Sequence, residues 1–221
     1  MENQTLIEKM PLMKYGELLK NSWKLFKEKW KKMFPLLAIE AIPLLVYSYY
    51  GDNFVLFVIS FIVSVWIGLS ILYILKDDSI DYSKALKLGW EKISSGIWIA
   101  ILNLVAILGG LILLVIPGII FMIWFYFSQY ILIFEDKKGK EALIASKKLV
   151  KGNWWNVFGK MMILILYIFA VMFCIMIPAG IILGDNGSPF ASTLVSIFLI
   201  SPFTSIYFYL FYKDLKRLKA E

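Results

Sequence analysis

The chain has 221 residues and a formal net charge of +7; 60% of its residues are apolar and only 18% are charged. Soluble domains are about 45–50% apolar and about 25% charged, and a mean hydropathy of +0.75 leaves more apolar surface than a core of this size can bury. A soluble globular enzyme is therefore excluded, and an all-α integral membrane protein is predicted. With no His and one Cys, the sequence also excludes His-based acid–base chemistry, His-ligated metals and an internal disulfide.

Six apolar stretches are long enough to cross a bilayer. A membrane-spanning helix needs roughly 20 mainly apolar residues, and none of these stretches contains Lys or Arg. The predicted fold is a polytopic bundle of six transmembrane helices in a single integral membrane domain, residues 1–221. The predicted spans are 33–50, 54–75, 97–116, 119–134, 161–183 and 190–212.

The third and fourth spans come from one apolar block, residues 97–134, which only Pro117-Gly118 interrupts. A single helix over this block would be about 57 Å long, nearly twice the hydrocarbon thickness. Proline removes a helix donor and glycine tolerates turn dihedrals, so a reversal at Pro117-Gly118 is expected. A pair of re-entrant half-helices is the alternative.

The basic residues predict the orientation of these spans. All 23 Lys and Arg fall within residues 9–32, 76–92, 137–160 and 213–219. Six spans place these four groups on one side of the membrane, and basic loops stay cytoplasmic. The prediction is a multi-pass protein of the plasma (inner) membrane with both termini in the cytoplasm.

Three segments on the predicted cytoplasmic side share a short pattern. An apolar pair is followed, after two positions, by a small residue: Ser22, Gly89 or Ser146. Two spans follow each segment, so the chain divides into three units of surface helix plus hairpin, at about 14–76, 82–135 and 140–212. Each unit begins and ends on the same side, so a structural repeat would be parallel, about an axis along the membrane normal.

The surface segments are amphipathic at helical spacing. Apolar residues between Tyr15 and Met33 follow i, i+3, i+4 steps, and lysines fill much of the remainder. Such helices lie in the headgroup plane. Six of the eight Trp flank the cytoplasmic span ends, where indole rings anchor proteins, and anchoring is favoured over a ligand-binding aromatic cluster. These six are Trp23, Trp30, Trp90, Trp98, Trp154 and Trp155.

Glu40 is the only acid within a predicted span. An intramembrane acid indicates a functional site, here for proton or cation handling. No Lys, Arg or His lies within a span to pair with it, so a structural hydrogen bond to Asn103 or Gln129 is the favoured interpretation. Glu40, Asn103 and Gln129 form the candidate intramembrane polar site.

A block of about 45 residues resembles a known family of membrane domains. It resembles the domain found beside glycerophosphoryl diester phosphodiesterases, and it is similar to related small prokaryotic membrane proteins of uncharacterised function. The block reads Ile116-Pro117-Gly118-Ile119-Ile120, then Trp124, Tyr130 and Glu135, then Ala142-Leu143, Ser146, Leu149-Val150, Gly152, Trp154-Trp155 and Val157-Phe158-Gly159.

The resemblance implies structural roles for part of this block and does not imply hydrolase activity. The catalytic barrel of those enzymes needs roughly 250 residues, more than the whole chain, and its chemistry uses histidine, which is missing here. The motif positions with expected structural roles are Pro117, Gly118, Glu135, Ala142, Leu143, Ser146, Gly152 and Gly159.

The sequence therefore predicts a non-catalytic membrane protein that acts through lipid or protein-partner contacts at its cytoplasmic face. Membrane lipids with anionic headgroups are the expected partners, and a membrane-protein partner or a homo-oligomer stays open. No nucleic-acid partner, catalytic residue, cofactor or metal is expected. The alternative is a transporter or permease component for a small solute, an ion or a lipid, with its polar site near Glu40.

Overall fold

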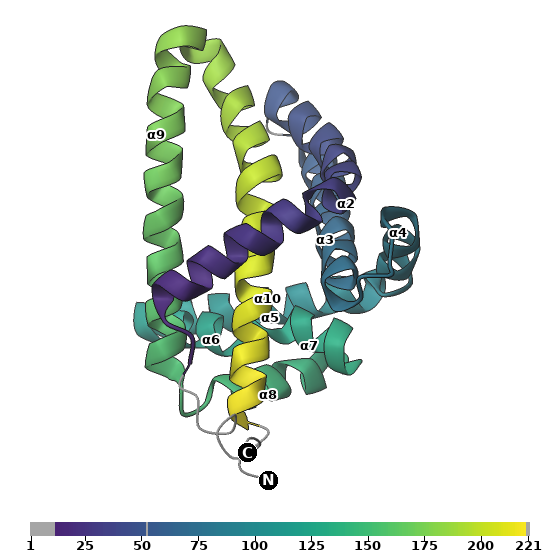
Figure 1. Cartoon of the computed structure of the whole chain (residues 1–221), viewed down its shortest axis with the longest axis vertical. Coiled ribbons are helices and arrows are strands. Elements are labelled where there is room, and N and C mark those ends of the chain that lie inside the picture. The colour runs from purple at the N-terminus through teal and green to yellow at the C-terminus, as the bar shows by residue number, and fades with distance from the viewer. Residues whose placement is uncertain (1–11, 52, 220–221) are drawn as a thin grey trace.

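The computed structural model describes residues 12–51 and 53–219, with the backbone alone described for 183–189. All regular structure in these residues is helical (Figure 1). Six helical stretches are long and apolar enough to cross a membrane, which confirms the predicted multi-pass helical fold. They are Tyr15–Tyr50, Phe54–Lys76, Ile93–Leu113, Val115–Glu135, Trp154–Ile182 and Phe190–Lys219.

The first surface segment and the first span form one helix. This helix, α2, is continuous over Tyr15–Tyr50. Its amphipathic half crosses α9 and α10 obliquely, and its second half stands beside α3 (Figure 1). Pro35 and Pro43 both lie inside α2, and proline is the commonest cause of a helix kink. The predicted surface helix is therefore an extension of the span and not a separate element.

The second surface segment folds back along the span that precedes it. After α3 (Phe54–Lys76), the short helix α4 (Tyr82–Glu91) runs beside its last turns. The indole nitrogen of Trp66 donates a 2.8 Å hydrogen bond to the carbonyl of Leu86. Gly89 packs so closely on α3 that a Cβ atom there would overlap a serine side chain. α4 is thus attached to the side of α3.

The second hairpin reverses earlier than predicted. α5 covers Ile93–Leu113 and α6 covers Val115–Phe125, and Leu114 between them has an extended backbone (φ −170°, ψ 155°). The expected reversal at Pro117 is therefore wrong by three residues. Proline fits the first turn of α6 because an amide there has no partner within the helix. Gly118 allows close contact between the two helices, since a Cβ atom on it would overlap a side chain of α5.

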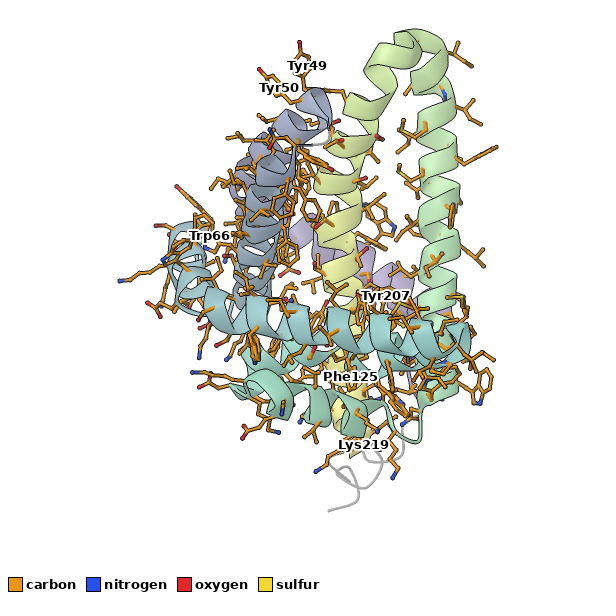
Figure 2. All side chains as sticks on the ribbon, turned by 180° about the vertical axis from the view of Figure 1, so that it is seen from behind. Tyr49, Tyr50, Trp66, Phe125, Tyr207 and Lys219 are labelled. Carbon is orange, nitrogen blue, oxygen red and sulfur yellow. The ribbon has the colours of Figure 1, made fainter. Side chains whose placement is uncertain are left out.

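The α5–α6 hairpin lies across the molecule instead of standing alongside the other two hairpins. Figure 2 shows α5 passing in front of α10 and at a different inclination from α3 and α9. At its tip the large apolar side chains of residues 112–116 are each at least 64% exposed, and such a patch indicates contact with lipid or protein. A hairpin that crosses the membrane and a re-entrant hairpin both return the chain to the side it left. The positions of the Lys and Arg residues therefore predict the same orientation for either arrangement.

A helix break separates α6 from α7 (Ser128–Glu135), and one side chain of α8 (Gly139–Val150) bridges it. The Ser146 hydroxyl donates to the Trp124 carbonyl (2.7 Å) and accepts from the Phe127 amide (3.1 Å). These two backbone groups would otherwise lack partners where the helical ladder stops. Ser146 thereby fixes α8 to the break.

The third hairpin is the tallest part of the molecule. α9 covers Trp154–Val195, a π-helical turn covers Ser196–Ile200, and α10 covers Ser201–Lys219. The chain reverses within α9 at the top of the view (Figure 1). The upper part of α9 exposes large apolar side chains such as Phe169 and Phe173, as expected of a lipid-facing helix.

Each of the three expected units contains one small residue of the repeated pattern. Ser22, Gly89 and Ser146, the small residues of the repeated pattern, are all buried. The pattern therefore marks positions where an amphipathic helix packs against a neighbour. The hairpins that follow are not arranged alike, because α5–α6 lies crosswise (Figure 1).

Candidate functional site

The expected intramembrane polar site is divided between two places. Glu40 of α2 is 7% exposed. Its carboxyl group lies near the Ser64 hydroxyl of α3, but its Oε2 atom is buried with no hydrogen-bond partner among the described residues. One turn away, Ser60 donates a 3.1 Å hydrogen bond to the Pro43 carbonyl. Glu40 therefore belongs to a polar contact between α2 and α3.

Asn103 and Gln129 line a different cavity, of about 300 Å³, which also contacts α3 and α10. The Asn103 amide donates to the Ser128 hydroxyl (3.0 Å), and its carbonyl oxygen is buried without a partner among the described residues. Glu40 does not line this cavity. The expected hydrogen bond between Glu40 and these amides is thus absent from the described part of the chain.

The six predicted interface tryptophans occupy two kinds of environment. Trp23 donates a 2.8 Å hydrogen bond to the Tyr167 hydroxyl, and its ring packs on Phe203. Trp30 packs on Phe198. These two rings attach α2 to the third hairpin and do not stand free at a surface.

Three of the remaining four tryptophans are exposed. Trp90, Trp98 and Trp155 are 58%, 52% and 76% exposed. The half-buried Trp154 stacks on Phe158, with ring centroids 5.4 Å apart. Exposed indole rings of this kind remain available to lipid.

The structural positions of the motif after Gly118 lie at the end of α7, on α8, and at or near the turn into α9. Ala142, Leu143 and Ser146 are buried. Gly152 has φ +90°, a left-handed conformation that favours glycine, and it turns the chain from α8 into α9. Gly159 lies against the Tyr15 hydroxyl of α2.

Glu135, the last residue of α7, accepts three hydrogen bonds. They come from Tyr212 (2.9 Å), Lys216 (2.9 Å) and Lys137 (2.7 Å). Glu135 therefore joins the end of α7 to α10, and its partners on α10 come from tertiary packing that the sequence does not reveal.

A small pocket of about 180 Å³ adjoins Glu135. We refer to it as the basic pocket. Four lysines against one glutamate give its lining a formal net charge of +3. Its lining residues are Glu135, Lys137, Ala145, Lys148, Leu149, Lys216 and Lys219. Lysines from α8, α10 and the segment between α7 and α8 meet here, which makes the pocket suited to an anion.

A second charged cluster, not predicted from the sequence, lies inside the protein. Lys160 and Asp214 are 3% and 2% exposed, and their charged atoms are 3.9 Å apart. Asp214 also accepts from the Met13 amide and from Arg217, both at 2.7 Å. The Lys160 ammonium lies 4.2 Å from the centre of the Phe211 ring. This cluster joins the start of α2, α9 and the end of α10.

Acidic and sulfur ligands do not gather anywhere in the described residues. No group of three or more Cys, Asp or Glu there is placed to hold a metal ion. Among the cavities described here, the basic pocket has the most charged lining.

Comparisons with known proteins give a family but no function. Neither the curated proteins nor the solved structures yield a match to this chain. The sequence profile of one family, described as a domain of unknown function (DUF7847), matches residues 42–215, which is well over half of the chain. The matched region runs from the second half of α2 into α10 and includes five of the seven residues that line the basic pocket; Lys216 and Lys219 lie beyond it. The protein thus belongs to the DUF7847 family.

Proposed function

We propose that this protein is a non-catalytic integral membrane protein that binds anionic phospholipid headgroups through its basic pocket, at the cytoplasmic face of the plasma (inner) membrane. The observation that carries the proposal is the convergence of four lysines on one cavity. Glu135 already engages Lys137 and Lys216. Among the described residues, Lys148 and Lys219 have no carboxylate partner, so their charges remain available to a phosphate.

The position of the pocket supports this assignment. Lys219 lies at the end of the molecule opposite Tyr49 and Tyr50 (Figure 2). The connector next to those tyrosines carries no Lys or Arg. Basic ends face the cytoplasm, where anionic lipids attract each nearby lysine by about 1 kcal/mol.

Thiol labelling tests the orientation. In a protein with its natural cysteine replaced, a membrane-impermeant maleimide should label Tyr50→Cys in intact cells. It should label Lys138→Cys only after the membrane is opened. Both side chains are exposed, and Lys138 follows Lys137 of the basic pocket, whose Lys219 lies at the end opposite Tyr50 (Figure 2). The reverse pattern would contradict the proposed sidedness.

Lipid binding by the purified protein tests the function itself. In a non-ionic detergent, phosphatidylglycerol should bind more tightly than phosphatidylcholine, and the difference should shrink as salt is raised. The double variant Lys148→Gln/Lys219→Gln should lose tenfold to thirtyfold in phosphatidylglycerol affinity, from about 1 kcal/mol per lysine. Lys84→Gln/Lys87→Gln is the matched control, because these exposed lysines lie on α4. Equal binding of the two lipids at every salt concentration would refute the proposal.

The cavity lined by Asn103 and Gln129 supports a second candidate function, transport of a small solute. The supporting observation is the buried, unpartnered carbonyl oxygen of Asn103 beside Gln129. A transport path requires water to reach this cavity. Asn103→Cys should then react with a small water-soluble thiol reagent in proteoliposomes, and lack of reaction would exclude this candidate.

A further inference from the structure

A large apolar groove lies between α6 and the start of α9. Its volume is about 650 Å³, within the roughly 300–1,000 Å³ typical of small-molecule sites. We refer to it as the aromatic groove. Its walls are Ile119, Ile120 and Trp124 of α6, facing Trp154, Trp155 and Phe158 of α9. All six residues belong to the motif block, so the motif builds this cavity.

One rim of the aromatic groove is basic. Lys151, at the turn from α8 into α9, lines the groove. The Lys147 ammonium lies 4.0 Å from the centre of the Trp124 ring, a cation–π contact. The apolar walls match an apolar chain, and the basic rim matches an anionic group at the end of that chain.

The groove and the basic pocket are neighbours. The backbone carbonyl of Lys151, a groove residue, accepts a 2.7 Å hydrogen bond from the Lys219 ammonium, which lines the basic pocket. Lys148 of the pocket and Lys147 of the rim are adjacent in α8. A ligand seated in the groove therefore places its end within reach of the pocket's lysines.

We propose that the aromatic groove and the basic pocket form one site for a single anionic phospholipid. An acyl chain lies against Trp154, Trp155 and Phe158, and the phosphate meets Lys151 and Lys219. The apolar walls favour a ligand with an acyl chain over a purely ionic one, and the lysine rim disfavours a purely apolar ligand. The inference rests on the proposed function, to which it adds the acyl-chain half of the site.

Three ligands test the headgroup half and the acyl-chain half of the site separately in the full-length protein. Glycerol phosphate carries only the headgroup chemistry, dihexanoyl phosphatidylglycerol has short chains and dipalmitoyl phosphatidylglycerol has long ones. Binding to detergent-solubilised protein can be followed by native mass spectrometry. The proposal expects affinity to rise with chain length, since each added methylene buries more apolar surface.

Substitutions in the groove should remove this chain-length dependence. Trp155→Ala removes an exposed side chain from the groove wall and should weaken binding of the long-chain lipid about tenfold. The binding of glycerol phosphate should not change. Trp90→Ala is the matched control, because Trp90 is also exposed but lies on α4. Ile120→Trp fills the groove without truncating a ring and should have the same effect. Size-exclusion profiles check that each variant is folded.

The outcomes distinguish the inference from the proposed function. If phosphatidylglycerol is preferred but neither groove substitution changes the chain-length dependence, the groove is not the site and the headgroup function stands. If glycerol phosphate competes as well as the long-chain lipid, the ligand is a free phosphate compound and the inference fails. If the unmodified protein does not prefer phosphatidylglycerol to phosphatidylcholine, the proposed function fails first, before any groove variant is made.

Discussion

Replacing Ser146 with alanine tests how the break between α6 and α7 is held. The side chain is fully buried and bonds both the Trp124 carbonyl and the Phe127 amide. Ser146→Ala leaves these two backbone groups without a partner. Each unsatisfied buried group costs about 1–3 kcal/mol, so the free energy of unfolding should fall by about 2–6 kcal/mol.

Thermal unfolding in detergent measures this loss. A change of 1 kcal/mol shifts the Tm of a chain of this size by about 2–4 °C, so Ser146→Ala should lower Tm by roughly 4–24 °C. Ser83→Ala is the control, because Ser83 is exposed on α4, and it should change the free energy of unfolding by less than about 0.5 kcal/mol. Equal Tm values for the two variants would refute the bridging role of the hydroxyl.

Three further predictions concern charged side chains. Asp214→Leu strands the buried ammonium of Lys160 and should destabilise the protein by about 3–5 kcal/mol. Lys160→Met should cost less, because Asp214 keeps its other partners; a larger loss for Lys160→Met in chemical unfolding would contradict this order. The Lys92 ammonium holds the pKa of the Asp136 carboxyl below its usual range, so the pair stabilises the fold above about pH 4 and loses this effect as pH falls through the lowered pKa. Tm should therefore decline more steeply on acidification in the unmodified protein than in Asp136→Asn, and parallel curves would argue against the pair. Glu40→Gln keeps a hydrogen-bonding group for the neighbouring serine, so its folded yield by size exclusion should equal that of the unmodified protein, whereas a loss of yield or of lipid binding would show that the carboxyl itself is needed.

Helix positions could be predicted where hydropathy alone determines them. The predicted span 54–75 agrees with α3, Phe54–Lys76, because a continuous apolar stretch ends there at a lysine and two acids. The chain reverses three residues before the predicted Pro117, because proline is tolerated in a first helical turn as well as in a loop. The crosswise packing of α5 depends on contacts between distant segments, which hydropathy does not encode.

The candidate site was only partly predictable for a similar reason. The sequence predicts that the lysines lie on one side of the membrane, but their meeting in the basic pocket requires α8 and α10 to pack together. Lys137 and Lys219 are far apart in the chain, and no spacing rule connects them. Trp124 and Trp155 both belong to the motif, but their facing positions in the aromatic groove could not be predicted. Helical periodicity relates residues within one helix and not residues on two different helices.

The crosswise hairpin also gives the molecule unequal ends. The end near Lys219 is broadened by α5, α6, α7 and α8, whereas the opposite end consists only of the tips of two slender hairpins (Figures 1 and 2). Where the hairpins cross a bilayer along this axis, we expect the wedge to occupy more area in one leaflet than in the other. Lateral pressure would then act unevenly along its length, and the energy of the protein in the membrane would depend on local curvature.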